Sequence, residues 1–157
     1  MLFVALGFGS GLVPRAPGTF GTLAAIPLYL LFFYLPWWAQ LFIVSVAFAV
    51  GVYCCQQAAA TLGEHDNPAI VWDEFVGLWL TLLALPLANT TLTPGYLLAA
   101  FVLFRCFDIL KPWPIRWADK RVSGGLGIML DDVLAGIYAG LGLWVLLWLT
   151  GNWLTGN

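Results

Sequence analysis

Charged side chains are scarce in this 157-residue chain. Six Lys and Arg and eight Asp and Glu make up 9% of it, whereas 62% of the residues are hydrophobic. An ordinary soluble domain carries about 25% charged residues. The composition therefore excludes that class and indicates a polytopic membrane protein. The net charge of −2 provides no basic field, so we expect no nucleic-acid partner.

Cysteine and histidine are also rare. The three cysteines have no metal-ligand spacing and lie in apolar runs, so no disulfide framework is implied. The single histidine, His65, lies in a polar loop, where a solvated side chain is the simplest interpretation. Phosphohistidine and phosphocysteine chemistry are both poorly supported.

Apolar runs make up most of the remaining sequence. They follow a Gly- and Pro-rich segment at residues 7–22, which cannot form a regular spanning helix. The runs cover residues 20–35, 39–62, 71–86, 96–110 and 128–149. We predict an all-α membrane helix bundle with about five spanning helices, in which residues 1–157 form one domain.

Several runs contain only about 14–17 uninterrupted apolar residues, against roughly 20 for a full span. The charged residues at their ends restore the length, so these residues should lie at or just inside one membrane interface. Five spans place Arg15 and the loops at 63–70 and 111–127 on one side of the membrane. The opposite side has the loops at 36–38 and 88–95, without Lys or Arg. The positive-inside rule makes the first side cytoplasmic.

Five carboxylates lie at helix ends on that side. Asp73 and Glu74 open the third run, Asp108 closes the fourth, and Asp131 and Asp132 open the fifth. Like charges held together near a low-dielectric phase repel unless a cation lies among them, and oxygen ligands favour Mg²⁺. The pattern therefore predicts a Mg²⁺ site. Helix capping or structural ion pairing is the alternative.

The spacing of glycines predicts which way two of these carboxylates point. Gly77 follows Asp73 at i+4, while Gly136 and Gly140 follow Asp132 at i+4 and i+8. Small residues at this spacing form a close-packing helix face. We therefore expect Asp73 and Asp132 to point towards neighbouring helices and not towards lipid.

Cations and glycine-rich turns accompany the carboxylates. Arg105 and Lys111 lie on one side of a helix end and are candidates to clamp a phosphate. The alternative is an Arg105–Asp108 ion pair plus a Lys111 side chain that extends to the membrane interface. Gly18 and Thr19 open the first run with Thr19 as its expected N-cap, and residues 123–127 precede the fifth run. Such helix starts offer free N–H groups to anions.

Residues 113–121 combine two tryptophans with two arginines and a lysine. Aromatic and basic side chains in one short segment are typical of the membrane interface. We interpret this segment as an interfacial strip that is attracted to anionic lipid.

Four motifs follow one another along nearly the whole chain. They read GFGSGLVPRAPGTFGT at 7–22, VWDEFVG at 71–77, FRCFDILKPWPIRW at 104–117 and GLGIMLDDVLAG at 125–136. In these motifs the chain resembles the phosphatidylglycerophosphatase A family of bacterial membrane lipid phosphatases. The resemblance implies Mg²⁺-dependent removal of the terminal phosphate of phosphatidylglycerophosphate. It also implies a multi-pass protein of the bacterial inner membrane with its active site facing the cytoplasm.

The resemblance and the residue patterns together suggest roles for individual side chains. The metal and catalytic candidates are Asp73, Glu74, Asp131 and Asp132. Asp108 is a further acid–base or orienting candidate. Phosphate would be held by the Arg105 and Lys111 side chains and by backbone donors at Gly18 and Thr19.

Two other classes of function remain open. A metal-dependent phosphatidyl-group transferase also uses Asp clusters at helix ends, but it would need a nucleotide-headgroup site, for which the sequence has no signature. A non-enzymatic ion carrier would need charge near mid-span, and the first two runs carry none.

Overall fold

The computed structural model describes residues 1–63 and 67–155, and this part of the chain contains helices and no strands. The predicted all-α class is confirmed. His65, which was expected in a polar loop, lies outside the described residues.

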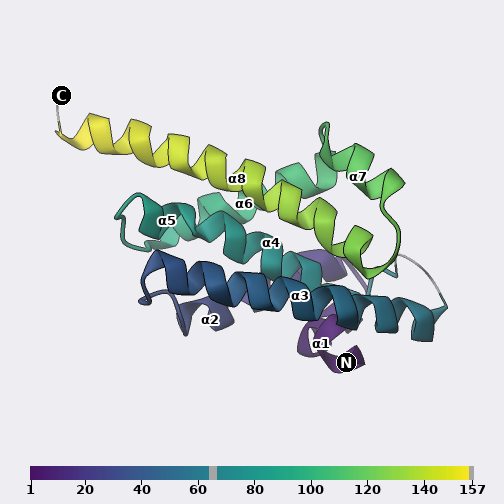
Figure 1. Cartoon of the computed structure of the whole chain (residues 1–157). Coiled ribbons are helices and arrows are strands. Elements are labelled where there is room, and N and C mark those ends of the chain that lie inside the picture. Colours follow the sequence, from purple (N-terminus) through teal and green to yellow (C-terminus); the bar gives the residue numbers. More distant parts are fainter. Residues whose placement is uncertain (64–66, 156–157) are drawn as a thin grey trace.

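Short helices at the N-terminus precede the long helices of the bundle (Figure 1). In chain order the elements are α1 (Leu2–Ala5), the 3₁₀ helix η1 (Gly7–Leu12), α2 (Pro17–Leu30), α3 (Trp37–Leu62), α4 (Trp72–Leu82), α5 (Ala84–Leu87), α6 (Pro94–Leu110), α7 (Ile115–Arg121) and α8 (Gly124–Thr155). Helix α4 lies at the centre, since it contacts α2, α3, α6 and α8. Figure 1 shows the N-terminus and α7 at one end of the bundle, and α5 and the C-terminus at the other.

Two of the described helices, α3 and α8, are long and apolar enough to cross a membrane. The other elements are shorter: α6 has 17 residues, α2 has 14 and α4 has 11. The outer surface is nonetheless widely apolar, with large side chains such as Leu31, Tyr34 and Leu110 exposed. A surface of this kind is consistent with a membrane location.

The predicted runs at 39–62 and 96–110 correspond closely to α3 and α6, but other boundaries were predicted wrongly. The first helix ends at Leu30 and not at residue 35, and the third run divides into α4 and α5. Helix α8 begins at Gly124, so the glycine-rich residues 123–127 are largely its first turn. Asp131 and Asp132 consequently lie about two turns inside α8 and do not open it.

The N-cap of α2 was also predicted wrongly. Pro17 is the first residue of the helix and Ala16 is its N-cap, in a left-handed conformation with φ of 51°. Proline suits this position because its missing N–H would have no partner within the helix. Thr19 therefore lies inside the first turn.

Glycines bring the backbones of α4 and α8 into contact. A Cβ atom added to Gly136 would lie 2.5 Å from the carbonyl oxygen of Gly77, and one added to Gly77 would lie 2.9 Å from that of Asp132. Any larger residue would therefore push the two helices apart. This contact confirms that Asp132 and the glycine face after it are turned towards a neighbouring helix.

Candidate active site

A charged pocket of about 280 Å³ lies where α2 and α4 begin, α6 ends and α8 passes. The structure brings eight of the nine predicted site residues to this pocket. They are Gly18, Asp73, Glu74, Arg105, Asp108, Lys111, Asp131 and Asp132. Thr19, the ninth, is half-buried and does not line the pocket.

The first turn of α4 supplies two of the carboxylates. Asp73 and Glu74 occupy this turn, where the positive end of the helix dipole favours negative side chains. The backbone N–H of Glu74 donates to Asp73 Oδ1 over 3.0 Å. Asp73 therefore satisfies one of the free N–H groups of α4 while it faces the pocket.

Glu74 joins three helices. Its carboxylate is buried, accepts a hydrogen bond from Thr22 Oγ1 of α2 and forms an ion pair with Arg105 Nη1 of α6. Gly18 makes room for this contact, because a Cβ atom there would collide with Glu74 Oε1. Glu74 is therefore already bound by side chains from two neighbouring helices.

Arg105 also pairs with Asp108, one turn further along α6, over 2.8 Å between Nη1 and Oδ2. The Arg105–Asp108 pair considered as an alternative is thus present. The guanidinium as a whole is nevertheless incompletely bonded, because its buried Nε atom has no hydrogen-bond partner among the described residues.

Lys111 does not extend along the interface but reaches into the site. Its Nζ atom lies 2.6 Å from Asp119 Oδ1 and 2.7 Å from Asp131 Oδ2. Burial lowers the pKa of Lys111, but hydrogen bonds to the two carboxylates raise it by more, so the pKa lies above its ordinary value. The ammonium therefore remains charged at neutral pH and can attract a phosphate.

The two aspartates of α8 have unused bonding capacity. Asp131 is 8% exposed and Asp132 is 3% exposed. Within residues 1–63 and 67–155, neither Asp131 Oδ1 nor Asp132 Oδ2 has a hydrogen-bond partner. Buried carboxylate oxygens without partners are costly, and a bound cation would remove that cost.

The orphaned oxygens of Asp131 and Asp132 are the atoms that would hold a divalent metal. Among the described residues, no three Asp, Glu, His or Cys side chains are already grouped as a metal site. Asp73, Asp131 and Asp132 line the same pocket and would have to move closer together around an ion. Glu74 is the least suited of the predicted ligands because Arg105 and Thr22 hold it.

Sequence reasoning missed two side chains that shape the site. Thr22 lies in the first motif, and its hydroxyl is within hydrogen-bond distance of two acceptors, Gly18 O at 2.8 Å and the Glu74 carboxylate, to either of which it can donate its one proton. Asp119 lies in the segment interpreted as an interfacial strip, and it binds Lys111. Thr22 could have been found from its place in the glycine-rich motif, whereas no local pattern indicates the role of Asp119.

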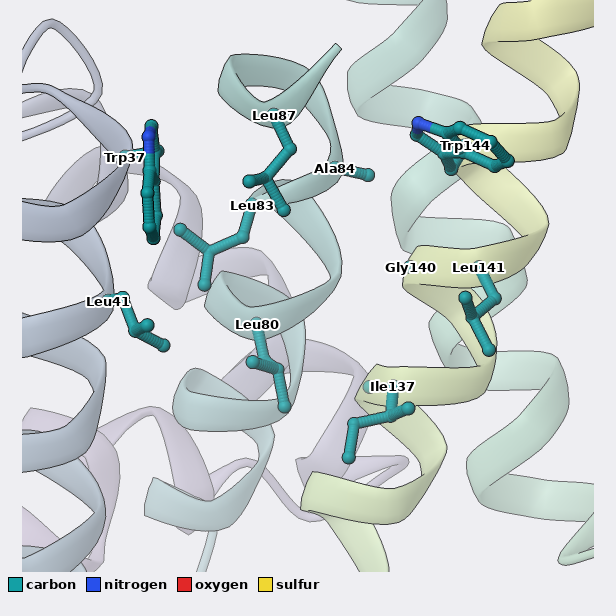
Figure 2. Close-up of a pocket in the computed structure, with 11 residues that line it drawn as sticks. Trp37, Leu41, Leu80, Leu83, Ala84, Leu87, Ile137, Gly140, Leu141 and Trp144 are labelled. Carbon is teal, nitrogen blue, oxygen red and sulfur yellow. The ribbon is translucent and has the colours of Figure 1, made fainter.

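A larger hollow of about 500 Å³ lies between α3, α4, α5 and α8 (Figure 2). Apolar side chains such as Leu41, Leu80 and Leu141 point into it, and Trp37 and Trp144 stand at one end. None of the side chains that line it is titratable. This hollow therefore offers no side chain for acid–base or metal chemistry, in contrast to the smaller charged pocket.

Comparison with known proteins shows which family the chain resembles. Residues 3–147 match the family model described as phosphatidylglycerophosphatase A. The chain is 51% identical to phosphatidylglycerophosphatase A of Escherichia coli over 134 residues, which cover 85% of this chain and 76% of that protein. It is 49% identical to phosphatidylglycerophosphatase A of Haemophilus influenzae over 138 residues, which cover 87% and 82% of the two chains.

A third relative carries a different name. A provisionally named phosphatidylinositol-3-phosphatase of Bacteroides thetaiotaomicron is 40% identical over 156 residues, which cover 96% of this chain and 95% of that protein. No solved structure matches the chain. From the family match and the two phosphatidylglycerophosphatases, the chain belongs to the phosphatidylglycerophosphatase A family.

Proposed function

We propose that this chain, acting as one integral-membrane domain, uses Mg²⁺ to remove the terminal phosphate of phosphatidylglycerophosphate. The products are phosphatidylglycerol and phosphate, so the reaction belongs to phospholipid biosynthesis. Membership of the phosphatidylglycerophosphatase A family supports the substrate and the reaction. The observation that carries the proposal is a single pocket that holds both cations and buried, unpartnered carboxylate oxygens.

The carboxylates would hold the metal. Asp131 and Asp132 have unpartnered oxygens, and Asp73 lines the same pocket from the start of α4. When bound, Mg²⁺ supplies neutralisation of phosphate charge and polarisation of the phosphoryl oxygens. Glu74 contributes mainly by fixing Arg105 and the start of α2.

The cations and the start of α2 would bind the phosphate. Lys111 and Arg105 bring two positive charges to the pocket, and Gly18 lines it where backbone N–H groups of α2 are free of helical partners. The terminal phosphate carries close to two negative charges near neutral pH. Asp108, which pairs with Arg105 and lines the same pocket, would exchange a proton with the phosphate or with water.

Phosphate release from purified protein tests this function. Mixed micelles containing phosphatidylglycerophosphate are incubated with Mg²⁺, with a chelator, or with the chelator followed by excess Mg²⁺. We expect release only when Mg²⁺ is present. Undiminished release in the chelator would contradict the metal requirement, and no release under any condition would contradict the reaction itself.

The name of the Bacteroides relative suggests a second substrate for the same assay. Phosphatidylinositol 3-phosphate is also a lipid phosphomonoester. We expect slower release from it, because the family match assigns this chain to phosphatidylglycerophosphatase A. A faster rate with phosphatidylinositol 3-phosphate would overturn the substrate assignment but not the reaction class.

We place the protein in the bacterial inner membrane as a multi-pass protein with the charged pocket facing the cytoplasm. The one-sided distribution of Lys and Arg supports this orientation. In addition to α3 and α8, the shorter α2, α4–α5 and α6 would complete about five spans. The C-terminus would then be periplasmic, opposite α7.

Cysteine labelling tests the orientation. Cys106 is exposed and is first changed to serine, while Cys54 and Cys55 are buried. A membrane-impermeant thiol reagent is then applied to intact cells that carry Gly151→Cys or Lys120→Cys. We expect labelling of Gly151→Cys only. Labelling of both variants from the same side would contradict the proposed topology.

A further inference from the structure

One ammonium is shared by two carboxylates from different helices. Lys111 Nζ contacts Asp119 Oδ1 of α7 at 2.6 Å and Asp131 Oδ2 of α8 at 2.7 Å. We propose that Asp119 is a positioning residue, which holds the Lys111 ammonium where it can bind the substrate phosphate. The proposal rests on the proposed function and assigns a role to a side chain outside the charged pocket.

Asp119 is placed to act on Lys111 and not on the substrate. It does not line the pocket, and its side chain is 31% exposed, whereas that of Asp131 is 11% exposed. Its helix is nevertheless fixed, because Ile115 and Ala118 on α7 are buried in the protein. Asp119 therefore presents a carboxylate to Lys111 from a firmly packed helix.

The backbone at Lys111 supports the same conclusion. The residue ends α6 in a left-handed conformation with φ of 42° and ψ of 60°. A residue with a side chain adopts this left-handed conformation less readily than glycine does, although it is a common way to end a helix. The chain turns at Lys111 and continues into α7. The Lys111 ammonium, at this turn, contacts Asp119 on that helix.

Asp119 also affects how strongly Lys111 binds Asp131. An ammonium has three N–H donors, and the described residues show two hydrogen bonds to this one. One donor is therefore left for a phosphate oxygen. Without Asp119, the Lys111 ammonium would pair with Asp131 alone, which is a predicted metal ligand. The ammonium would then be less available to bind phosphate.

The experiment measures KM and kcat for phosphatidylglycerophosphate in mixed micelles at saturating Mg²⁺. The variants are Asp119→Asn, Asp119→Glu, Lys111→Met and the double variant Asp119→Asn/Lys111→Met. Lys120→Ala is the matched control, because it changes the charge of the adjacent exposed residue on the same helix. Thermal unfolding of each variant is recorded in the same detergent.

We expect Asp119→Asn to raise KM about 10-fold while kcat changes less, by analogy with residues that orient metal ligands, whose loss costs about 10- to 100-fold. Asp119→Glu should restore KM to within about threefold of wild type, because it returns the carboxylate. In the Lys111→Met background, Asp119→Asn should change KM less than about twofold, because a residue that acts through Lys111 has nothing left to position.

Three results would overturn the proposal. The first is a wild-type KM for Asp119→Asn, and the second is an equal rise in KM whether or not Lys111 is present. The third is an Asp119→Asn protein that fails to fold or melts far below wild type, which would make the role structural. Each is distinct from failure of the proposed function, in which the wild-type protein itself releases no phosphate.

Discussion

The two ends of the helix bundle bury polar groups in contrasting ways. At the end remote from the charged pocket, Gln40 is fully buried and uses both ends of its amide. It accepts a hydrogen bond from Tyr29 at 2.9 Å and donates to the carbonyl oxygens of Phe33 at 2.7 Å and Leu35 at 2.8 Å. Tyr29 also reaches Leu82 O at 3.2 Å. This network is neutral and closes the turn between α2 and α3.

The charged pocket is organised differently. Arg105 Nε, Asp131 Oδ1 and Asp132 Oδ2 are buried there without a partner among the described residues. A buried polar atom without a partner lowers stability by about 1–3 kcal/mol, and by more when the group is charged. The neutral network therefore serves stability, whereas the charged pocket gives up stability and retains bonding capacity for a ligand.

We expect the largest loss of activity when Asp132 in the charged pocket is substituted. Asp132→Asn keeps the size of the side chain and removes the charge, so the helix contact at Gly136 should survive. We expect turnover to fall about 1,000-fold, the upper range for loss of one preorganised electrostatic group. Phosphate release is measured across a Mg²⁺ titration, which should show a weaker response to the metal, and thermal unfolding should stay close to wild type.

Substitutions of the other three carboxylates test whether all four contribute to the proposed metal site. Asp73→Asn and Asp131→Asn should also lose most activity, whereas Glu74→Gln should lower stability as well as turnover, because Glu74 holds Arg105 and Thr22. If all four variants, Asp132→Asn included, kept turnover within a few-fold of wild type, the proposed metal site would be wrong.

The next effect concerns the phosphate-binding cation. Lys111→Met removes the ammonium but keeps much of the apolar stem, and it leaves Asp119 and Asp131 without their shared partner. We expect kcat/KM to fall about 30- to 150-fold, equivalent to roughly 2–3 kcal/mol. Initial rates on phosphatidylglycerophosphate at saturating Mg²⁺ measure this fall, and a nearly silent variant would move the phosphate site to Arg105 and the start of α2.

The sequence predicted much of this arrangement because some signals are local. Pro112 ends α6 next to Lys111, and the acidic residues at 73 and 74 mark the start of α4. The glycines at 77 and 136 indicated which side of each helix would meet a neighbour. Eight of the nine predicted site residues meet in one pocket for these reasons.

The parts that sequence reasoning missed depend on contacts between distant residues. In the first turn of α8, the N–H of Gly125 donates to Gln56 Oε1 of α3, so a side chain that is distant in sequence satisfies one of the first N–H groups of the helix. Glycines otherwise favour a turn, so the helix start could not be read locally. Likewise, Asp119 approaches Lys111 only because α7 packs against α8, and a separation of eight residues does not predict it.

A third and smaller effect is expected in the neutral network around Gln40, where a substitution should affect stability and not activity. Gln40→Leu leaves the carbonyl oxygens of Phe33 and Leu35 without their donor. We expect the free energy of unfolding to fall by about 1–3 kcal/mol, while the specific activity of the folded protein stays unchanged. Thermal unfolding and phosphate release are measured on the same samples.

Tyr29→Phe is the matched control for Gln40→Leu. It removes one hydroxyl and leaves the amide of Gln40 bound to both carbonyl oxygens, so the loss of stability should be smaller. A Gln40→Leu protein of normal stability but low activity would show that the neutral network is part of the active site, and the contrast between the two ends would then be wrong.

The smallest expected effect lies at Lys120. This lysine is exposed on α7 beside Asp119, and it does not line the charged pocket. Lys120→Ala should therefore keep kcat/KM within about twofold of wild type, because an exposed charge acts mainly through screened attraction to anionic lipid. Rates in micelles with and without added anionic lipid, each at low and high salt, measure that attraction. If Lys120→Ala lowered kcat/KM more than Lys111→Met does, phosphate binding in the pocket would not limit the reaction. The attraction of the lipid substrate to α7 would limit it instead.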